Sequence, residues 1–211
     1  MAEDKQDEQA KQGAPTPGPE PPAKPATEAK EAAPKPAAPK PAGPSPEPWQ
    51  GDLVTSLRAS FPEAAIEALS YLGQHYLILP RESILPASMY LKSECGFDML
   101  TDLTAVDYPK REKRFEVIYQ LYSFPKNERL RLKVPVGEAE EIESVVPVWA
   151  TADWLEREAF DMFGIRFAHH PNLKRILLPE EWQGYPMRKD YGILQQDVKW
   201  VQENLHIESG Q

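Results

Sequence analysis

The first 48 residues constrain most strongly what this 211-residue chain can fold into, because they contain no Leu, Ile, Val, Phe, Tyr or Trp. They hold 13 of the 23 prolines, mostly in Ala-Pro-Lys runs such as residues 34–40. A stretch without apolar surface to bury cannot offset the conformational entropy that is lost on ordering. We therefore predict that residues 1–48 form a disordered Pro/Ala/Lys-rich arm, partly in polyproline II conformation.

Charge and hydropathy exclude several classes of function. The net charge of the chain is −9, and the arm, with six Lys and eight acidic residues, contributes only −2 of it. A body with a net charge of −7 argues against binding to nucleic acid or to anionic lipid. No run of about 18 apolar residues exists, so no membrane span is expected. The polar start, residues 1–7, lacks the apolar core of a signal peptide. We expect a cytoplasmic protein that meets a membrane only through other proteins.

The chain has one cysteine, Cys95. It cannot form a disulfide within the chain, and an iron–sulfur cluster or a structural zinc site would need several thiolates. Cys95 is therefore expected to be a small buried hydrophobic residue. None of the 11 glycines forms a G-x-G-x-x-G motif or a phosphate-binding loop. We expect no cofactor, no metal and no catalytic residue in this chain.

Hydrophobic periodicity predicts an α+β domain over residues 49–164. The expected helices cover residues 51–61, 81–94, 138–146 and 153–163, with a last short helix over 195–205. The expected strands cover residues 65–72, 75–79, 98–107, 114–123 and 129–136. Pro86 falls inside the second helix, which should kink or start late. The predicted fold is a small mixed or antiparallel sheet with packed helices, followed by a long extended C-terminal segment over residues 165–211.

Two of the predicted strands, 114–123 and 129–136, form a hairpin through the link at residues 125–127. Strand 114–123 has apolar residues on both sides, which predicts a central strand covered on both faces. Strand 129–136 alternates apolar residues with Arg129, Arg131 and Lys133, which predicts a half-exposed strand with a basic outer face.

Helix 153–163 has more apolar surface than the single face of about a hundred degrees that a surface helix needs. Its side chains form three stripes: Leu155, Ala159 and Met162; Phe160 and Phe163; Trp154, Glu158 and Asp161. Asp153 and Glu156 fit a capping box, and Gly164 fits a C-terminal stop. Two compatible interpretations stay open. Either the acids pair with the arginines of the chain itself, or the helix lies between its own sheet and a partner subunit.

The following stretch, residues 165–192, is rich in Pro, Gly and Arg and has little periodicity. Irregular segments of this length usually need a second surface, and arginine and aromatic residues are favoured at interfaces. We predict that residues 153–191 cannot satisfy their apolar and cationic side chains alone and that the C-terminal segment wraps a partner. The predicted interface or salt-bridge network comprises Glu156, Glu158, Asp161, Phe163, His170, Arg175, Arg188, Lys189, Asp190 and Tyr191.

Two chemical alternatives are weak. His169 and His170 are adjacent, and neighbouring side chains rarely point the same way, so a metal site there is not favoured. Glu158 and Asp161 could act as a general acid and base, but no nucleophile or substrate motif accompanies them. A salt-bridge network between these acids and Arg175, Arg188 or Lys189 is the favoured interpretation.

The stretch 156–165, Glu-Arg-Glu-Ala-Phe-Asp-Met-Phe-Gly-Ile, closely resembles the signature of the complex I 30-kDa subunit family, the C subunit of NADH-quinone oxidoreductase. Further segments resemble the family in order and spacing: residues 102–109, 114–119, 170–177 and 182–191, together with Phe167. The resemblance spans about residues 50–192. Met187 stands where the family usually has Leu, and His169 stands where it often has Gly.

This resemblance implies a structural subunit of the peripheral arm of complex I, on the cytoplasmic side of the bacterial inner membrane. It implies packing against the D subunit, which carries the quinone site, and proximity to the B and I subunits. The complex would pass electrons from NADH to quinone, coupled to proton translocation, with FMN and the iron–sulfur clusters held by partner subunits. The alternatives are the equivalent subunit of a related membrane-bound hydrogenase or formate hydrogenlyase, and a small independent metalloenzyme.

Overall fold

The structure is a computed structural model that describes residues 44–192 and 198–206. The predicted disorder of residues 1–43 concerns residues outside this range. Within it, the last two residues of the predicted arm already belong to the sheet. Strand β1, Glu47–Pro48, pairs antiparallel with Leu69 and Ser70 of the next strand.

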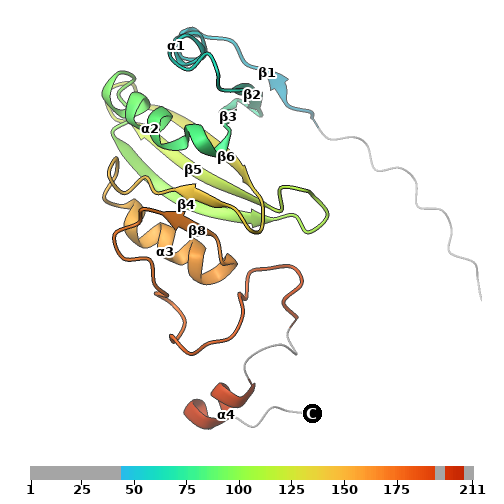
Figure 1. Cartoon of the computed structure of the whole chain (residues 1–211). Coiled ribbons are helices and arrows are strands. Elements are labelled where there is room, and N and C mark those ends of the chain that lie inside the picture. The colour runs from blue at the N-terminus through green and yellow to red at the C-terminus, as the bar shows by residue number, and fades with distance from the viewer. Residues whose placement is uncertain (1–43, 193–197, 207–211) are drawn as a thin grey trace, which may run out of the picture. The chain divides into compact units, whose positions relative to one another are not determined.

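The centre of the molecule is a six-stranded mixed sheet with the strand order β1-β2-β3-β6-β5-β4 (Figure 1). The remaining strands are β2 Glu67–Tyr71, β3 Gln74–Ile78, β4 Met99–Asp107, β5 Phe115–Ser123 and β6 Glu128–Val136. Only the β3–β6 pair is parallel, and the other neighbours are antiparallel. The α+β fold with a mixed sheet was therefore predicted correctly.

The helices are α1 Asp52–Ser60, the short 3-10 helix η1 Arg81–Ser83, α2 Ile84–Ser93, α3 Ala152–Phe163 and α4 Val198–Leu205. Pro86 lies in the first turn of α2, where a backbone N–H has no partner within the helix, so the proline is tolerated. This confirms the late start that the proline predicted. None of the helices in the described parts of the chain is long and apolar enough to cross a membrane.

One face of the sheet is buried under the helices. In β5, Phe115, Val117, Tyr119 and Leu121 are buried, and the residues between them are only half-buried. The buried residues of β5 share one hydrophobic cluster with residues of α1, α2 and α3. The prediction that β5 is covered on both faces was wrong, because the helices pack on the same side of the sheet. Cys95 is buried at the edge of this core, as predicted.

The predicted acidic helix over residues 138–146 is wrong. The structure has a short strand here, β7 Glu141–Glu143, which pairs parallel with β8 Arg166–Ala168. Helix propensity is weak compared with tertiary contacts. In this stretch Ile142 is buried, and the acidic side chains of Glu140 and Glu141 contact Lys113 and Arg166 rather than one another.

The start of α3 also differs from the prediction. The helix begins at Ala152, after Thr151, and no side chain caps its first turn. Glu156 does not act in a capping box, because it lies inside the helix with its side chain in the core. The predicted C-terminal stop is confirmed: Gly164 has a φ of +76° and donates its N–H to the carbonyl of Phe160.

Candidate functional site

Helix α3 and the irregular segment after it form the candidate site. The buried side of α3 includes Ala159 and Phe163, and the ring of Phe163 packs edge-on against Phe115 with the ring centroids 6.5 Å apart. This contact fixes the helix on the sheet. The residues after β8, up to residue 192, then run back along α3 without regular secondary structure, as predicted.

Asp161 holds the middle of that segment, and we call its contacts the Asp161 anchor. The carboxylate is fully buried; Oδ1 accepts from Arg175 Nη1 at 2.6 Å. Oδ2 accepts from the backbone N–H groups of residues 176, 177 and 178 at 3.1, 2.8 and 2.9 Å. Burial alone would raise the pKa of Asp161. The hydrogen bonds, led by Leu178 N–H and the Arg175 guanidinium, outweigh burial and lower the pKa below its usual value. The carboxylate is therefore held ionised.

The guanidinium groups around this anchor are satisfied by backbone carbonyls of the same chain. Arg175 Nη2 donates to the carbonyls of Trp182 and Gly184, at 3.1 and 3.0 Å. Arg157 donates to the carbonyls of Lys174 and Arg175, at 3.2 and 3.1 Å. The predicted salt bridge between Asp161 and Arg175 is therefore confirmed, and Arg175 needs no partner surface. Its charge is neutralised by Asp161, and its remaining donors fix the turn that follows.

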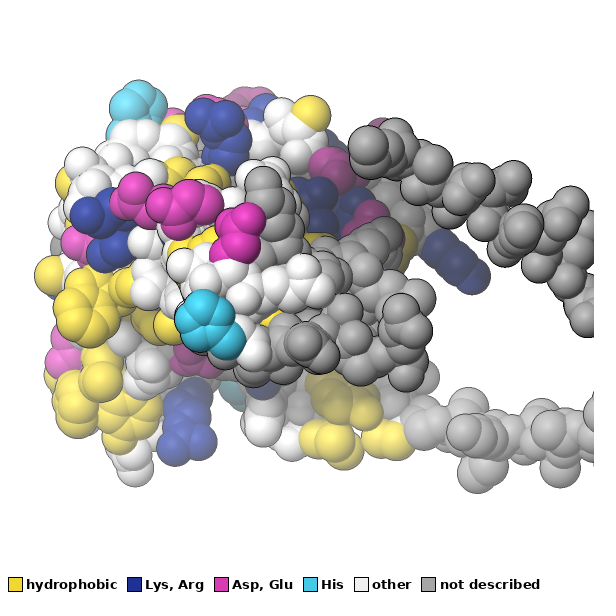
Figure 2. Space-filling view, turned by 90° about the horizontal axis from the view of Figure 1, so that it is seen from below, with side chains coloured by type: hydrophobic (Ala, Val, Ile, Leu, Met, Phe, Trp, Pro, Cys, Tyr) yellow, Lys and Arg dark blue, Asp and Glu magenta, His cyan; other side chains and the backbone are white. Residues whose placement is uncertain are grey.

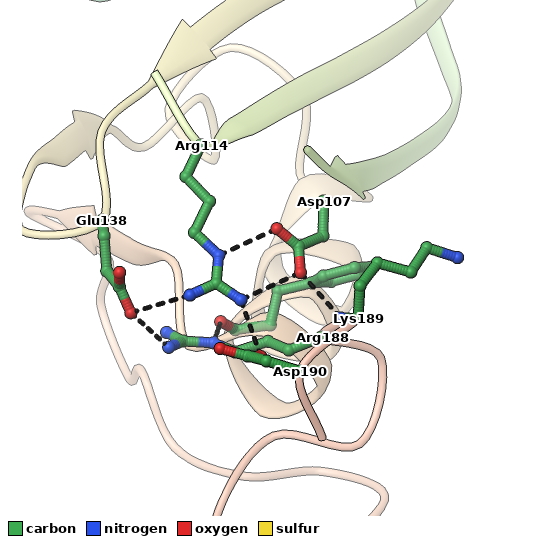
Figure 3. A network of polar contacts seen from close by, with 7 residues as sticks. Asp107, Arg114, Glu138, Arg188, Lys189 and Asp190 are labelled. Carbon is green, nitrogen blue, oxygen red and sulfur yellow. Dashed lines mark hydrogen bonds and ion pairs between the residues drawn. The ribbon is translucent and has the colours of Figure 1, made fainter. Parts of the chain in front are cut away.

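A second group of contacts, the Arg114 cluster, fixes the end of the segment (Figure 3). Arg114 binds both carboxylate oxygens of Asp107, at 2.8 and 3.0 Å, and also contacts Glu138 at 3.2 Å and Asp190 at 2.7 Å. The same Asp107 accepts from the backbone N–H of Lys189 at 2.7 Å. The hydrogen bond from Arg114 outweighs burial and holds the pKa of Asp107 below its usual value. These carboxylates hold Arg114 firmly protonated by raising its pKa.

Arg188 links this cluster to the end of α3. Its Nε donates to the carbonyl of Phe163 at 2.6 Å, and its Nη1 donates to Glu138 at 2.7 Å. Its guanidinium also lies over the ring of Tyr185, 4.6 Å from the centroid. A cation that binds the last carbonyls of a helix also interacts favourably with the helix dipole. Arg188 therefore pairs within the chain, but with Glu138 rather than with the predicted Glu158 or Asp161.

Glu156 and His170 meet beneath the first turns of α3. Glu156 is fully buried and its Oε1 accepts from Val145 N–H at 2.7 Å. Burial raises the pKa of Glu156 to about 7, against the opposing hydrogen bonds from Ser144 and Val145. The closest approach of His170 Nε2 to Glu156 Oε2 is 3.9 Å.

The two adjacent histidines point to different partners. His170 Nδ1 accepts from the N–H of Asn172 at 3.0 Å, which places the ring hydrogen on Nε2, facing the Asp153 carbonyl at 3.1 Å. His169, at a φ of +59°, binds Glu143 at 2.9 Å on the surface, and this hydrogen bond raises its pKa. Among the described residues, no group of three His, Cys, Asp or Glu side chains is arranged to hold a metal ion.

The remaining residues of the predicted network make fewer contacts in the site. Glu158 is exposed and has no ion pair among the described residues, so its predicted salt bridge is wrong. Lys189 contributes its backbone N–H, while its side chain extends away from the Arg114 cluster (Figure 3). Tyr191 packs its ring so closely on Gly184 that an added Cβ there would lie 2.6 Å from the ring.

Sequence reasoning missed Asp107, Arg114, Glu138 and Arg157. One signal was available for Asp107. It continues the buried alternation of Leu103 and Ala105 in β4, so the period of the strand places this acid at an inward-facing position. An acid in such a position needs a cation or several donors.

Comparisons with known proteins identify the family of the chain. The sequence model of the family described as "Respiratory-chain NADH dehydrogenase, 30 Kd subunit" matches residues 77–197. The C subunit of NADH-quinone oxidoreductase from Geotalea uraniireducens is 45% identical over 139 residues, covering 65% of this chain and 85% of the relative. The corresponding proteins of Trichlorobacter lovleyi and Brucella ovis are 48% and 43% identical over 140 and 143 residues. They cover 65% and 67% of this chain, and 86% and 71% of the relatives.

The fold is also found in a solved structure. A chain of the membrane-bound sulfane sulfur reductase, an archaeal respiratory membrane complex, superposes with a TM-score of 0.57 at 22% identity. The superposition covers 75% of this chain and 92% of that chain, which shows a common fold. The matched region of the sequence model contains α3, the Asp161 anchor and the Arg114 cluster. The chain therefore belongs to the family of the 30-kDa subunit of respiratory-chain NADH dehydrogenase, which is the C subunit of NADH-quinone oxidoreductase.

Proposed function

We propose that this chain is a structural subunit of NADH-quinone oxidoreductase, with no cofactor or catalytic residue of its own. It lies in the peripheral arm, on the cytoplasmic side of the bacterial inner membrane. It packs against the D subunit, which carries the quinone site, and near the B and I subunits. Electron transfer from NADH through FMN and iron–sulfur clusters to quinone, coupled to proton translocation, takes place in the partner subunits.

The observation that carries this proposal is that residues 165–192 are held by polar contacts within the chain while two of their apolar side chains stay exposed. Their polar groups point inward to Asp161 and to the Arg114 cluster, while Leu177 and Met187 stay 62% and 54% exposed. An irregular segment usually turns its apolar side chains inward. The exposure of these two side chains supports a segment that presents a preformed apolar surface to another protein.

The observations favour this proposal over an independent metalloenzyme. Both ring nitrogens of His170 are engaged by backbone groups, and His169 lies on the surface with Glu143. A catalytic metal would need about three protein ligands around an open position. The identity of 40–48% to C subunits of NADH-quinone oxidoreductases supports that complex rather than a related hydrogenase or formate hydrogenlyase.

The proposal is tested by affinity purification of the full chain, tagged at its N-terminus, from detergent-solubilised native membranes. We expect the D, B and I subunits to co-purify in equal amounts with NADH:quinone activity, and the chain expressed alone to contain no stoichiometric zinc or iron. Recovery with hydrogenase subunits, or recovery as an isolated metalloprotein with activity, would contradict the proposal.

A variant separates a structural role from a chemical one. Arg175→Ala removes the partner of a buried carboxylate, so we expect less assembled complex, with an unchanged KM for quinone in the complex that remains. Arg129→Ala, on an exposed position of β6, serves as the matched control and should assemble normally. Normal assembly of Arg175→Ala with an altered KM for quinone would argue for a role in the chemistry instead.

A further inference from the structure

A small groove lies where α3, β4 and the irregular segment after β8 meet. Its walls include Leu103 of β4, Met162 of α3, and Leu177 and Met187 of the irregular segment, and its volume is about 110 Å³. Figure 2 views the molecule from the side where α3 and this segment lie, and hydrophobic side chains (yellow) are exposed there beside charged ones. The groove is therefore an apolar hollow on a surface that also carries charge.

The groove continues along one stripe of the helix. Trp154, Glu158 and Met162 are spaced four residues apart, so they lie on the same face of α3. Trp154 is 70% exposed, the most exposed of the tryptophans in the described residues. Tryptophan and methionine are enriched at the centres of protein interfaces. An exposed aromatic next to an open apolar groove is typical of a docking site rather than of a solvated surface.

Glu158 is the one charged residue that lines the groove. No ion pair to it is found in the described parts of the chain, and three guanidinium groups of α3 and the following segment are engaged elsewhere. Arg157 and Arg175 bind backbone carbonyls and Asp161, and Arg188 binds Glu138. The groove thus combines an apolar hollow with one carboxylate that lacks a cation.

We infer that this groove receives an apolar side chain of another subunit of the same complex, flanked by a Lys or Arg that pairs with Glu158. This inference rests on the proposed function. The volume resembles that of an engineered apolar cavity of about 150 Å³ that holds benzene, so one medium-sized side chain fits. An ion pair between Glu158 and this Lys or Arg would fix the orientation of the partner and disfavour partners without a cation there.

Two other occupants fit the groove less well. A symmetric contact with a second copy would bring the same patch of both copies together, so that Glu158 would face Glu158 without a cation. An anionic lipid surface would meet the same carboxylate on a chain with a net charge of −9. The charge of the groove therefore favours a basic protein partner.

Cysteine labelling tests whether the groove is covered in the complex. Cys95 is buried, so thiols introduced by Leu177→Cys and Met187→Cys dominate the reaction with maleimide. Phe124→Cys, at a position 64% exposed beyond the end of β5, is the matched control. In the isolated full chain we expect all three variants to react at similar rates. In the assembled complex we expect at least a tenfold slower reaction for Leu177→Cys and Met187→Cys, with the control unchanged.

The outcome distinguishes this inference from the proposed function. If Leu177→Cys and Met187→Cys react in the assembled complex as fast as in the isolated chain, the groove is not an interface, although the chain is a subunit. If the chain does not co-purify with the complex at all, the proposed function itself fails.

Crosslinking and charge reversal identify the occupant. A photoreactive maleimide attached to the Met187→Cys variant should crosslink to one other subunit, at a peptide with Lys or Arg within about four residues of an apolar side chain. Crosslinks to a second copy, to lipid or to residues 193–211 of the same chain would overturn the inference. Glu158→Lys should lower the yield of assembled complex about tenfold, while Glu63→Lys, the same change at an exposed site, should not. A normal yield with Glu158→Lys would refute the pairing.

Discussion

Removal of the Asp161 carboxylate gives the sharpest test of the anchors. Asp161→Ala leaves the Arg175 guanidinium without its counter-ion and three backbone N–H groups, those of residues 176–178, without their acceptor. Loss of one side of a buried ion pair costs about 3–5 kcal/mol. An N–H group that stays buried without a partner costs about 1–3 kcal/mol more.

The expected total is smaller than the sum of these values. The Arg175 side chain is 13% exposed, so water replaces part of the lost interactions. We expect a loss of about 4 kcal/mol, which is a large share of the roughly 5–15 kcal/mol that stabilises a typical domain. For a domain of this size, 1 kcal/mol shifts the unfolding midpoint by about 2–4 °C, so Tm should fall by about 8–16 °C. If the segment detaches while the rest of the domain stays folded, the loss of global stability cannot exceed the free energy with which the segment docks. The fall in Tm is then smaller.

Two measurements on the full chain cover both cases. Thermal unfolding followed by near-ultraviolet circular dichroism reports the change in Tm. Hydrogen exchange of the amides of residues 176–178 reports local detachment, and an opening free energy that falls by about 4 kcal/mol accelerates exchange about 1,000-fold. Glu158→Ala is the matched control on the same helix and should change the stability by less than about 0.5 kcal/mol. An Asp161→Ala chain with Tm within about 2 °C of the parent and unchanged exchange would refute the role of the anchor.

Three further predictions concern the same site. Arg114→Lys keeps the charge but loses the bidentate pair, so urea unfolding should show a loss of about 2–3 kcal/mol. Glu156, with its pKa raised by burial from 4.5 to about 7, retains its proton in the folded state longer than in the unfolded state. The free energy of unfolding should therefore fall as pH rises from about 4.5 to 7. Glu156→Gln should remove this fall, so urea unfolding at pH 8 should find the variant up to roughly 3 kcal/mol more stable than the parent chain. Gly164→Ala places a Cβ 2.6 Å from the ring of Tyr185 and should lower the stability by more than about 2 kcal/mol. The control Gly73→Ala, at a similar φ but with open space around the Cβ, should lower it by about 1 kcal/mol. Equal losses in thermal unfolding would contradict this prediction.

The parts of the fold that the sequence predicted are those with a clear local period. Strand β5 alternates buried and half-buried residues over nine positions and β6 over its last seven, and the hairpin between them follows from their spacing. The end of α3 was predicted because Gly164 takes a left-handed conformation that other residues adopt only at a cost. In these places local preference and tertiary packing agree.

The wrong helix over residues 138–146 and the missed Arg114 cluster share a different cause: their charges find partners far away in the sequence. Residues 138–146 looked like an acidic helix, but Glu138 binds Arg188, 50 residues later, and Glu143 binds His169. The pairing of Asp161 with Arg175 was predicted because both lie in one recognisable stretch. The Arg114 cluster was missed because its members come from three separate segments, which the periodicity of any one of them does not connect.

The expectation that the cations of residues 153–191 need a partner surface was wrong for Arg175 and Arg188, and this outcome sharpens the function. Because Asp161 and the Arg114 cluster engage these cations within the chain, the apolar residues are the part left for a partner. A segment that is ordered before binding loses little conformational entropy when the partner arrives. The anchors should thus affect assembly without touching the partner, whereas the groove should affect assembly without supporting the fold. Asp161→Ala should therefore lower both Tm and the yield of complex, and Glu158→Lys should lower the yield alone. If both variants lowered Tm and yield in the same proportion, the separation between an inner anchor and an outer docking surface would be wrong.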